Sequence, residues 1–333
     1  MLSQDRINGC FWGLALGDAL GQQVEFNQIE VIRQRYGPKG IQQPNSRALW
    51  TDDTEMTFAV TRALIHLGAV ATSQNLSDDA IGRVFAEEFI KWFDNPGYGP
   101  GPTCMGAVNF LRSHSAANWQ LSGKNDSKGC GSVMRAAPLG LWFADPIAPE
   151  LAARKGPIYD LLVRISTIQS EITHGHKAAT AAALAGSYAV ALAANGIRPM
   201  KMLEPIKHLC NPLHPDFSRV MTKLETTLVL RAGGIINNDV DAMHAIGLGW
   251  VGDEAFAMAI YSAIQYPDDL QACLHAAVNH NGDSDSVGCI AGSIVGALHG
   301  MKSIPLEWIK RLAEKKRMEE MLQQVSSFFL NKS

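Results

Sequence analysis

The sequence predicts an all-α protein folded as one compact domain of many helices. Three observations support this fold class. Apolar residues recur at helical spacing through most of the 333 residues, alternating strand patterns are nearly absent, and no Pro-, Gly- or Ser-rich linker separates compositionally distinct halves. With 47% hydrophobic and 18% charged residues, the chain has enough apolar material for a large core. We therefore expect a single domain over residues 1–333.

The first predicted helix covers about residues 4–20 and carries an unusual stripe of glycines. Gly9, Gly13, Gly17 and Gly21 are four residues apart, which places them on one helix face. Glycine costs about 1 kcal/mol in a helix interior, so four on one face require an explanation. Close approach of a second helix is the favoured one. A membrane dimer helix is the alternative, and polar residues such as Asp18 argue against it.

Helical periodicity predicts further helices along the rest of the chain. The Ala-rich stretch 176–194 is apolar nearly all round, is shorter than a typical membrane span and carries polar residues, so we interpret it as a central buried helix. The other predicted helices begin after Asp53 and Ser286 or cover about 77–93, 218–232, 252–265, 267–278 and 305–328. The glycine-rich segments 95–106 and 122–132 are predicted to be loops.

Composition and charge argue against several classes of function. The formal net charge of −3 at pH 7 gives no sign of the basic face that nucleic-acid-binding proteins usually carry. The N-terminus shows no basic segment followed by an apolar run, so no signal peptide is visible. Six cysteines without a CxxC pair favour free buried thiols in a reducing compartment. We expect a cytoplasmic monomer with no nucleic-acid or membrane partner.

Two short acidic segments carry the candidate chemistry. They are WTDDTE, from Trp50 to Glu55, and NGDSDS, from Asn281 to Ser286, and each comes directly before an apolar helix. Each brings two carboxylates and a hydroxyl into about one helical turn. Helix capping explains either segment taken singly, and Asp52 with Glu55 matches a capping box.

Taken together, the two segments predict a metal centre with oxygen ligands. Four carboxylates held close together repel strongly in a low-dielectric site, and two divalent cations would balance their charge. The donors on offer are oxygen atoms only, which suits Mg²⁺, Mn²⁺ or Ca²⁺ and does not suit structural zinc. The second segment is too short for an EF-hand loop and lacks the distal Glu.

These segments, with several others, resemble the ADP-ribosylglycohydrolase family, which includes the dinitrogenase-reductase-activating glycohydrolases. The shared motifs run in the family's order over most of the chain: GDALG at 17–21 with Glu25-Phe26, WTDDT at 50–54, GCGSVMR at 129–135, Thr173-His174, GLGWV at 247–251 with Glu254, and GDSDS at 282–286. Each motif is modest alone, and their combination carries the resemblance. Ser286 stands where many members have Thr, and Cys130 stands where the common pattern has Asn.

The resemblance implies an all-α fold around a dinuclear Mg²⁺ or Mn²⁺ centre. The residues that match the family's metal ligands are Thr51, Asp52, Asp53, Asp283, Asp285 and Ser286. Asp285 would bridge both ions, with Thr51, Asp52 and Asp53 on one ion and Asp283 and Ser286 on the other. We expect Cys130 to affect the shape of the nearby substrate loop rather than the metal centre.

The implied reaction breaks a bond at the anomeric carbon of ADP-ribose through an oxocarbenium-like transition state. Two metal ions can coordinate the ribose hydroxyls, and they can orient a water molecule or lower its pKa. Glu25 and the bridging Asp285 are the candidate catalytic residues. Glu25 matches the family's acidic residue and would transfer a proton or stabilise the cation, and a solvated loop carboxylate is the alternative interpretation.

Several further residues are candidates for binding the substrate. The diphosphate can accept hydrogen bonds from the backbone N–H groups of Gly129 and Gly131 and from the hydroxyl of Ser132. Alternatively, these residues only form a tight turn. The loop from Asp94 to Thr103 covers the substrate, with Asp94 near the ribose, or is a plain surface loop. His174 stacks on or hydrogen-bonds the substrate, or is a satisfied buried histidine. We interpret Trp250 and Glu254 mainly as packing and helix-start residues.

The predicted function is hydrolysis of an ADP-ribosylated protein or a small ADP-ribose conjugate, with ADP-ribosyl-arginine as the leading substrate class. One alternative is a hydrolase of the same fold that acts on ADP-ribosyl-serine, O-acetyl-ADP-ribose or another conjugate. The other is a non-catalytic binding or immunity protein that recognises ADP-ribosylated partners or a toxin. The complete ligand set argues against an inactive site, and the sequence carries no readable code for the leaving group.

Overall fold

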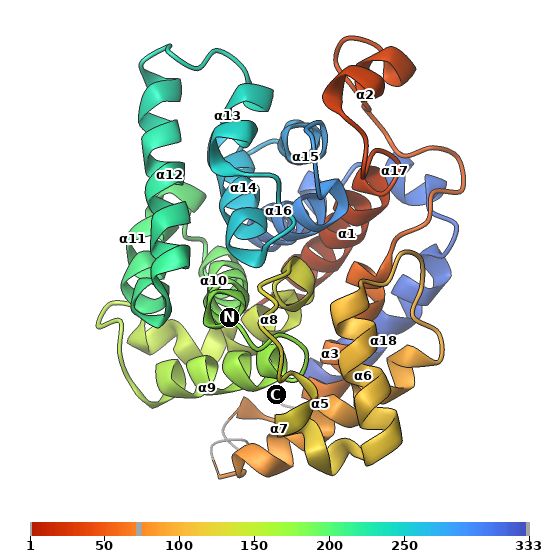
Figure 1. Cartoon of the computed structure of the whole chain (residues 1–333), viewed down its shortest axis with the longest axis vertical. Coiled ribbons are helices and arrows are strands. Elements are labelled where there is room, and N and C mark those ends of the chain that lie inside the picture. Colours follow the sequence, from red (N-terminus) through yellow and green to blue (C-terminus); the bar gives the residue numbers. More distant parts are fainter. Residues whose placement is uncertain (1, 71–74, 331–333) are drawn as a thin grey trace.

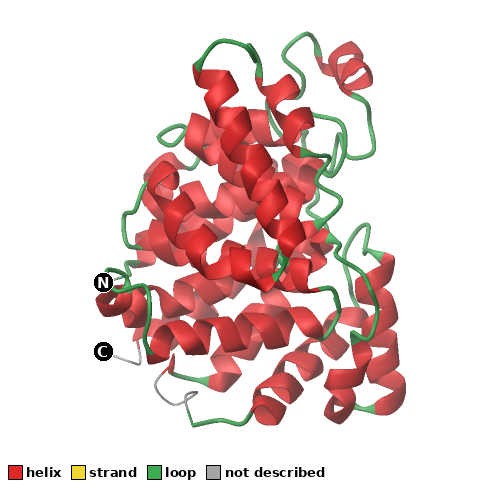
Figure 2. Cartoon of the chain, turned by 60° about the vertical axis from the view of Figure 1, so that its left-hand side comes forward, coloured by secondary structure: helices red, strands yellow, loops and turns green. Residues whose placement is uncertain are grey.

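The computed structural model describes residues 2–70 and 75–330. Over these residues the chain forms helices joined by loops and turns, with no β-strand and three isolated bridges between single residue pairs (Figure 2). The prediction of an all-α fold is confirmed. Its buried apolar side chains form one continuous cluster that draws on helices from both ends of the chain.

Two helices from opposite ends of the chain pack with their backbones in contact. These are α1 (Gln4–Gly21) and α16 (Ser284–His299), which lie side by side in the molecule (Figure 1). A Cβ atom added at Gly13 would overlap the carbonyl group of Gly292, and one added at Gly17 would overlap that of Gly288. The close helix approach predicted from the glycine stripe is confirmed. The partner is itself a glycine stripe, at four-residue spacing on α16.

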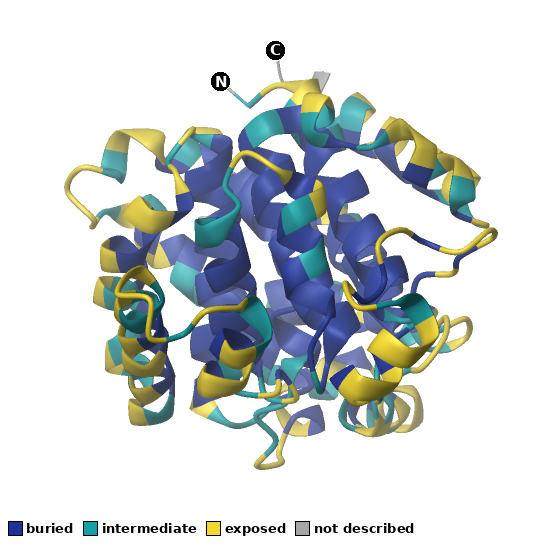
Figure 3. Ribbon diagram, turned by 90° about the horizontal axis from the view of Figure 1, so that it is seen from above, coloured by how far each residue is buried: buried dark blue, intermediate teal, exposed yellow. Residues whose placement is uncertain are grey.

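The centre of the molecule is the Ala-rich helix α10 (Lys177–Ala194), which packs against α8 (Ala137–Ile147), α9 (Pro157–Glu171), α14 (Gly252–Gln265) and α16. Among the described residues, α10 is the one helix long and apolar enough to cross a membrane, but 94% of it is buried inside the protein. Figure 3 shows the buried helices surrounded by partly exposed ones. The prediction of a central buried helix is confirmed.

The remaining helices surround this core. On one side lie α3 (Asp52–Leu67), α5 (Asp78–Phe93), α6 (Pro102–His114) and α18 (Lys315–Leu330), and on the other lie α11 (Pro199–Cys210), α12 (Pro215–Ala232) and α13 (Asp239–Ile246) (Figure 1). The others are α2 (Ile29–Tyr36), α7 (Trp119–Ser122), α15 (Leu270–Val278), α17 (Leu306–Arg311) and the short 3-10 helices Ala116–Asn118, Cys130–Ser132, Ala148–Glu150, Asn211–Leu213 and Gly300–Ser303.

Several of the predicted element boundaries are wrong, and the structure gives a physical cause for two of them. The single helix predicted over 305–328 is split into α17 and α18, because the extended residue Leu312 is buried and its neighbours exchange backbone hydrogen bonds with Ala48. The glycine-rich loop predicted over 95–106 ends early, because Pro102 occupies the first turn of α6. Helices α2, α6, α7, α8, α9, α11 and α13 were not predicted.

The glycine contact between α1 and α16 predicts that one added methyl group there lowers the stability of the protein. Gly13→Ala should lower the free energy of unfolding by about 1–3 kcal/mol, because the new Cβ forces the two backbones apart. The matched control is Gly106→Ala on α6, where an added Cβ meets no atom within 4 Å. That change should raise stability by about 0.5–1 kcal/mol. Urea unfolding of both variants tests this, and equal shifts would contradict it.

Candidate metal centre and substrate cavity

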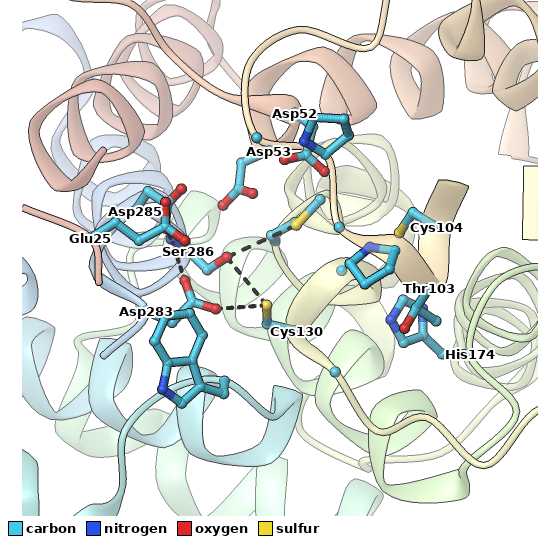
Figure 4. Close-up of a pocket in the computed structure, with 18 of the residues that line it drawn as sticks. Glu25, Asp52, Asp53, Thr103, Cys104, Cys130, His174, Asp283, Asp285 and Ser286 are labelled. Atoms are coloured by element: carbon cyan, nitrogen blue, oxygen red, sulfur yellow. Dashed lines mark hydrogen bonds between the residues drawn. The ribbon is translucent and has the colours of Figure 1, made fainter. Parts of the chain in front are cut away.

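The two acidic segments open onto one cavity of about 500 Å³. Its walls come from the turn after α1, the starts of α3 and α16, the segments 99–104 and 129–131, and Trp250. In Figure 4, Glu25, Asp283 and Asp285 lie on one side, Asp52 and Asp53 come from α3, and His174 lies on the far wall. This volume is typical of a site for a small molecule or cofactor.

The first acidic segment is held at the start of α3 by a buried aspartate on α1. Thr51 is the N-cap, and its Oγ1 accepts from the N–H of Asp53 at 3.2 Å. The carboxylate of Asp18 accepts from the N–H of Thr51 at 2.9 Å, from that of Thr54 at 3.1 Å and from the Thr54 hydroxyl. Asp18 is fully buried. The sequence motifs predicted no site role for Asp18, although an aspartate beside the glycine stripe of a buried helix was a usable signal.

Glu55 anchors the same segment from the other side. Its carboxylate accepts from Trp50 Nε1 at 2.8 Å and from both terminal nitrogens of Arg317 on α18 at 2.6 Å. The capping-box interpretation of Asp52 with Glu55 is therefore wrong, since Thr51 is the N-cap and Glu55 turns away from the helix start. The last helix of the chain thus fixes the segment that carries Asp52 and Asp53.

The second acidic segment forms the first turn of α16, one turn earlier than predicted. Asp283 is the N-cap, and its Oδ1 accepts from the N–H of Ser286 at 3.2 Å. Gly282 precedes it with a φ of +127°, and a Cβ there would overlap the carbonyl of Leu248. Asp283 can cap the helix and also face the cavity, because Oδ1 makes the capping bond while Oδ2 accepts from the Cys130 thiol at 2.9 Å.

Three carboxylates, one from the turn after α1 and two from the start of α16, converge, and Asp52 and Asp53 line the same cavity. Ligand oxygens of Glu25, Asp283 and Asp285 all lie within 4.8 Å of one another. Burial, followed by the charge of Asp285, raises the pKa of Glu25 to about 9 and raises the pKa values of Asp52 and Asp53 well above their ordinary range. The described residues that line the cavity include no Lys or Arg. The negative charge must therefore be balanced by protons or by bound cations.

The donor set fits hard divalent cations. Asp53 Oδ2 is buried and has no hydrogen-bond partner among the described residues, so it has an unused acceptor beside the cavity. The acidic side chains offer carboxylate oxygens, and Thr51 and Ser286 add hydroxyl oxygens at the same helix starts. Mg²⁺, Mn²⁺ and Ca²⁺ prefer such ligands.

A second group of candidate metal ligands lies away from the cavity, and its members already take part in helix capping and ion pairs. His176, His214 and Asp216 bring ligand atoms within 4.8 Å of one another. Nδ1 of His176 and of His214 each accepts the capping N–H of a helix start, which leaves the proton on Nε2. Asp216 pairs with Lys128 and Arg219. These contacts explain the group as helix capping and ion pairing.

The wall opposite the carboxylates is built around a neutral histidine. His174 is buried, and burial followed by the charge of Arg135 lowers its pKa to about 3. Thr173 Oγ1 accepts from Arg135 at 2.9 Å and lies 2.8 Å from His174 Nδ1. The Thr173 hydroxyl also donates to the Ser170 carbonyl at 3.4 Å, so its contact with Nδ1 positions the His174 ring without fixing which ring nitrogen carries the proton. A Cβ at Gly131 would come within 2.8 Å of the imidazole, so glycine is needed there.

Two of the predicted substrate residues lie outside the cavity wall. Gly129 and Gly131 line the cavity, whereas Ser132 is fully buried behind them and donates to the carbonyl of Ala179 at 3.3 Å. Asp94 follows α5, its side chain is 66% exposed, and it pairs with Arg112 at 3.1 Å. The loop does reach the cavity, through residues 99–101.

An aromatic pair lies at the cavity and was not predicted. Phe26 and Trp250 stack with ring centroids 5.1 Å apart and an angle of 19° between their planes. Both line the cavity and remain exposed, Phe26 at 76% and Trp250 at 38%. Trp250, interpreted mainly as a packing residue, thus packs on Phe26 and also lines the cavity. Glu254 does act at a helix start, where it accepts from the N–H of Leu248 at 3.0 Å.

The sequence and the all-helical fold of this chain are similar to those of known proteins. The family described as ADP-ribosylglycohydrolase matches residues 2–332. The chain is 28% identical to the ADP-ribosyl-[dinitrogen reductase] glycohydrolase of Rhodospirillum rubrum, over 95% of this chain and 92% of that protein. It is 23% identical to an ADP-ribosylarginine hydrolase of Pseudomonas putida, over 96% of this chain and 78% of that one.

A solved structure described as an ADP-ribosylglycohydrolase-related protein complex has the same fold. Its TM-score to this chain is 0.68, with 24% identity over 98% of each chain. The chain therefore belongs to the ADP-ribosylglycohydrolase family, a family of ADP-ribosyl hydrolases. The resemblance inferred from the sequence motifs is confirmed.

The anchor between α3 and α18 predicts a measurable coupling. Arg317→Met should lower the free energy of unfolding by about 1–3 kcal/mol, because the buried Glu55 carboxylate keeps only Trp50 as a partner. Adding Glu55→Gln should restore part of this loss. The control is Arg83→Met, whose ion pair with Asp79 is half exposed and should contribute less than about 0.5 kcal/mol. Denaturant unfolding measures all four proteins, and similar losses for Arg317 and Arg83 would refute the anchor.

Proposed function

We propose that this protein is an ADP-ribosyl hydrolase with two divalent metal ions, Mg²⁺ or Mn²⁺, in the cavity between α3 and α16. One observation carries the proposal: two acidic helix starts, far apart in the sequence, face one cavity whose described lining offers no Lys or Arg to balance them. Membership of the ADP-ribosylglycohydrolase family supports the reaction class.

The chain's own residues divide into two sets of ligands. Thr51, Asp52 and Asp53 would hold one ion, Asp283 and Ser286 the other, and Asp285 both. Ions bound there supply Lewis-acid polarisation of ribose hydroxyls and of a water. The unpartnered Asp53 Oδ2 supports this assignment. The N-termini of α3 and α16 also point toward the site, and their dipoles favour anionic side chains in the first turn.

Glu25 and His174 provide the remaining chemistry. Hydrolysis breaks the bond from the anomeric carbon to the leaving group and forms a bond from that carbon to a water oxygen. Glu25 lies among the carboxylates and would accept the proton of the attacking water or return it to the leaving group. His174, neutral and part of the cavity lining, would form a hydrogen bond with the substrate.

We propose ADP-ribosyl-arginine as the leading substrate. Two relatives are named for removing ADP-ribose from dinitrogen reductase and from ADP-ribosylarginine. The exposed Phe26–Trp250 pair beside an acidic cavity suits a planar guanidinium, because cations are attracted to aromatic faces and to carboxylates. Ser132 and Asp94 are not needed in this proposal.

Release of ADP-ribose tests the proposed reaction. Purified protein with Mg²⁺ or Mn²⁺ should release ADP-ribose from the arginine-linked substrate faster than from serine-linked or O-acetyl forms, and a chelator should abolish release. Asp285→Asn should lower the rate by about a hundredfold or more, because a charged bridging ligand is lost. Ser286→Ala should lower it less, because one neutral oxygen is lost. Full turnover in metal-free protein, verified by elemental analysis, would refute the metal requirement.

A thermal-shift titration tests the shared metal site without a substrate. A cation that binds only the folded protein stabilises it by about 2.7 kcal/mol at a hundred times its dissociation constant, so the melting temperature should rise with Mg²⁺ or Mn²⁺. The variant with Asp52→Asn and Asp283→Asn should be at least as stable as wild type without metal, since it relieves repulsion. It should gain less from added metal. Identical responses of the two proteins would argue against a shared site.

A further inference from the structure

Cys130 lies directly against the second set of proposed ligands. Its Sγ is 2.9 Å from Asp283 Oδ2 and 3.4 Å from Ser286 Oγ (Figure 4). Ser286 Oγ is also 4.0 Å from Met134 Sδ, so this hydroxyl sits between two sulfur atoms. Of the six free cysteines, five are buried, whereas Cys130 is partly exposed and lines the cavity.

The spacing of these atoms matches donors that share one ion. With metal–oxygen bonds of about 2.1 Å and a metal–sulfur bond of about 2.3 Å, oxygen and sulfur lie about 3.1 Å apart at a right angle and about 3.6 Å apart at a tetrahedral angle. The separation of 3.4 Å from Ser286 Oγ lies within this range, and that of 2.9 Å from Asp283 Oδ2, now a hydrogen bond from the thiol, lies just below it. An ion held by Asp283 and Ser286 would thus meet the Cys130 sulfur with little rearrangement.

A second observation points to a ligand in the same cavity. Asp53 Oδ2 belongs to a residue that is only 3% exposed, lines the cavity and finds no hydrogen-bond partner among the described residues. An acceptor of this kind is costly to bury unless something binds it. The sulfur therefore lines the same cavity as an unused buried acceptor, which belongs to the first set of proposed ligands.

We propose that Cys130 is a ligand of the ion held by Asp283 and Ser286, and that it makes this position selective for thiophilic divalent ions such as Zn²⁺, Co²⁺ or Fe²⁺ over Mg²⁺. The inference rests on the proposed two-ion centre and changes the ion expected at this one position from Mg²⁺ or Mn²⁺ to a thiophilic ion. Sulfur donors select softer metals, whereas carboxylates and hydroxyls alone suit Mg²⁺ and Mn²⁺. The sulfur binds as thiolate, and its proton leaves to solvent. An Asn at this position offers no comparable donor.

Spectroscopy of the Co²⁺ form tests the sulfur–metal bond directly. Wild-type protein with Co²⁺ should show an ultraviolet sulfur-to-cobalt charge-transfer band, which Cys130→Ser and Cys130→Asn should lose. The control is Cys104→Ser, since the Cys104 sulfur lines the same cavity but lies 3.8 Å from Arg135 instead of beside a carboxylate. This variant should keep the band. In competition titrations the preference for Zn²⁺ over Mg²⁺ should fall at least about tenfold in Cys130→Ser.

If a Cys130 variant fails to fold, protection of Cys130 from alkylation can be measured in the wild-type protein instead. Zn²⁺ or Co²⁺ should slow alkylation of Cys130, mapped by mass spectrometry, and Mg²⁺ should not. Binding of Co²⁺ without the band, with unchanged alkylation, would overturn the sulfur ligand while leaving the metal centre intact. A band lost in Cys104→Ser and kept in Cys130→Ser would also overturn it. If no divalent ion binds, the proposed metal centre and this inference both fail.

Discussion

The backbone contact between α1 and α16 is the constraint on which the site depends. Glycines on both helices allow the two backbones to meet, and the contact continues to the end of α1, where a Cβ at Gly21 would overlap the backbone of Asp285. The same contact brings Asp18 and Glu25, at the end of α1 and in the turn after it, next to the first turn of α16. A bulkier residue along the stripe would separate the helices and, with them, the carboxylates.

The site brings buried carboxylates close together at a cost in free energy, so contacts elsewhere in the fold must keep them in position. Buried carboxylates repel, and the fold offsets this only in part through capping N–H groups, helix dipoles and the hydrogen bonds that Asp18 accepts. The residues that hold the acidic segments in place therefore lie far from them in the sequence. Arg317 of the last helix, for example, fixes the start of α3 through Glu55. On the far wall, Arg135 orients His174 through Thr173 and does not itself enter the cavity lining.

The cavity has two chemically different walls. One wall is formed by carboxylates and hydroxyls, and the other by glycines and a neutral imidazole. Cys130 lies where the two walls meet, because it belongs to the glycine segment yet contacts Asp283 and Ser286. A substitution in a loop expected to shape the substrate site thereby reaches the ligands of the proposed metal centre.

The sequence alone determined the fold class, the close-packed glycine helix, the buried Ala-rich helix and the two acidic segments. These features follow from local periodicity and composition, which depend on residues a few positions apart. The tertiary structure decided what depends on distant pairs. It split the last predicted helix at Leu312 through Ala48, and it moved Asp94 and Ser132 out of the cavity and Trp250 into it. It also gave Asp18 and Cys130 their partners, because contacts 33 and 153 residues apart in the sequence leave no local pattern that would reveal them.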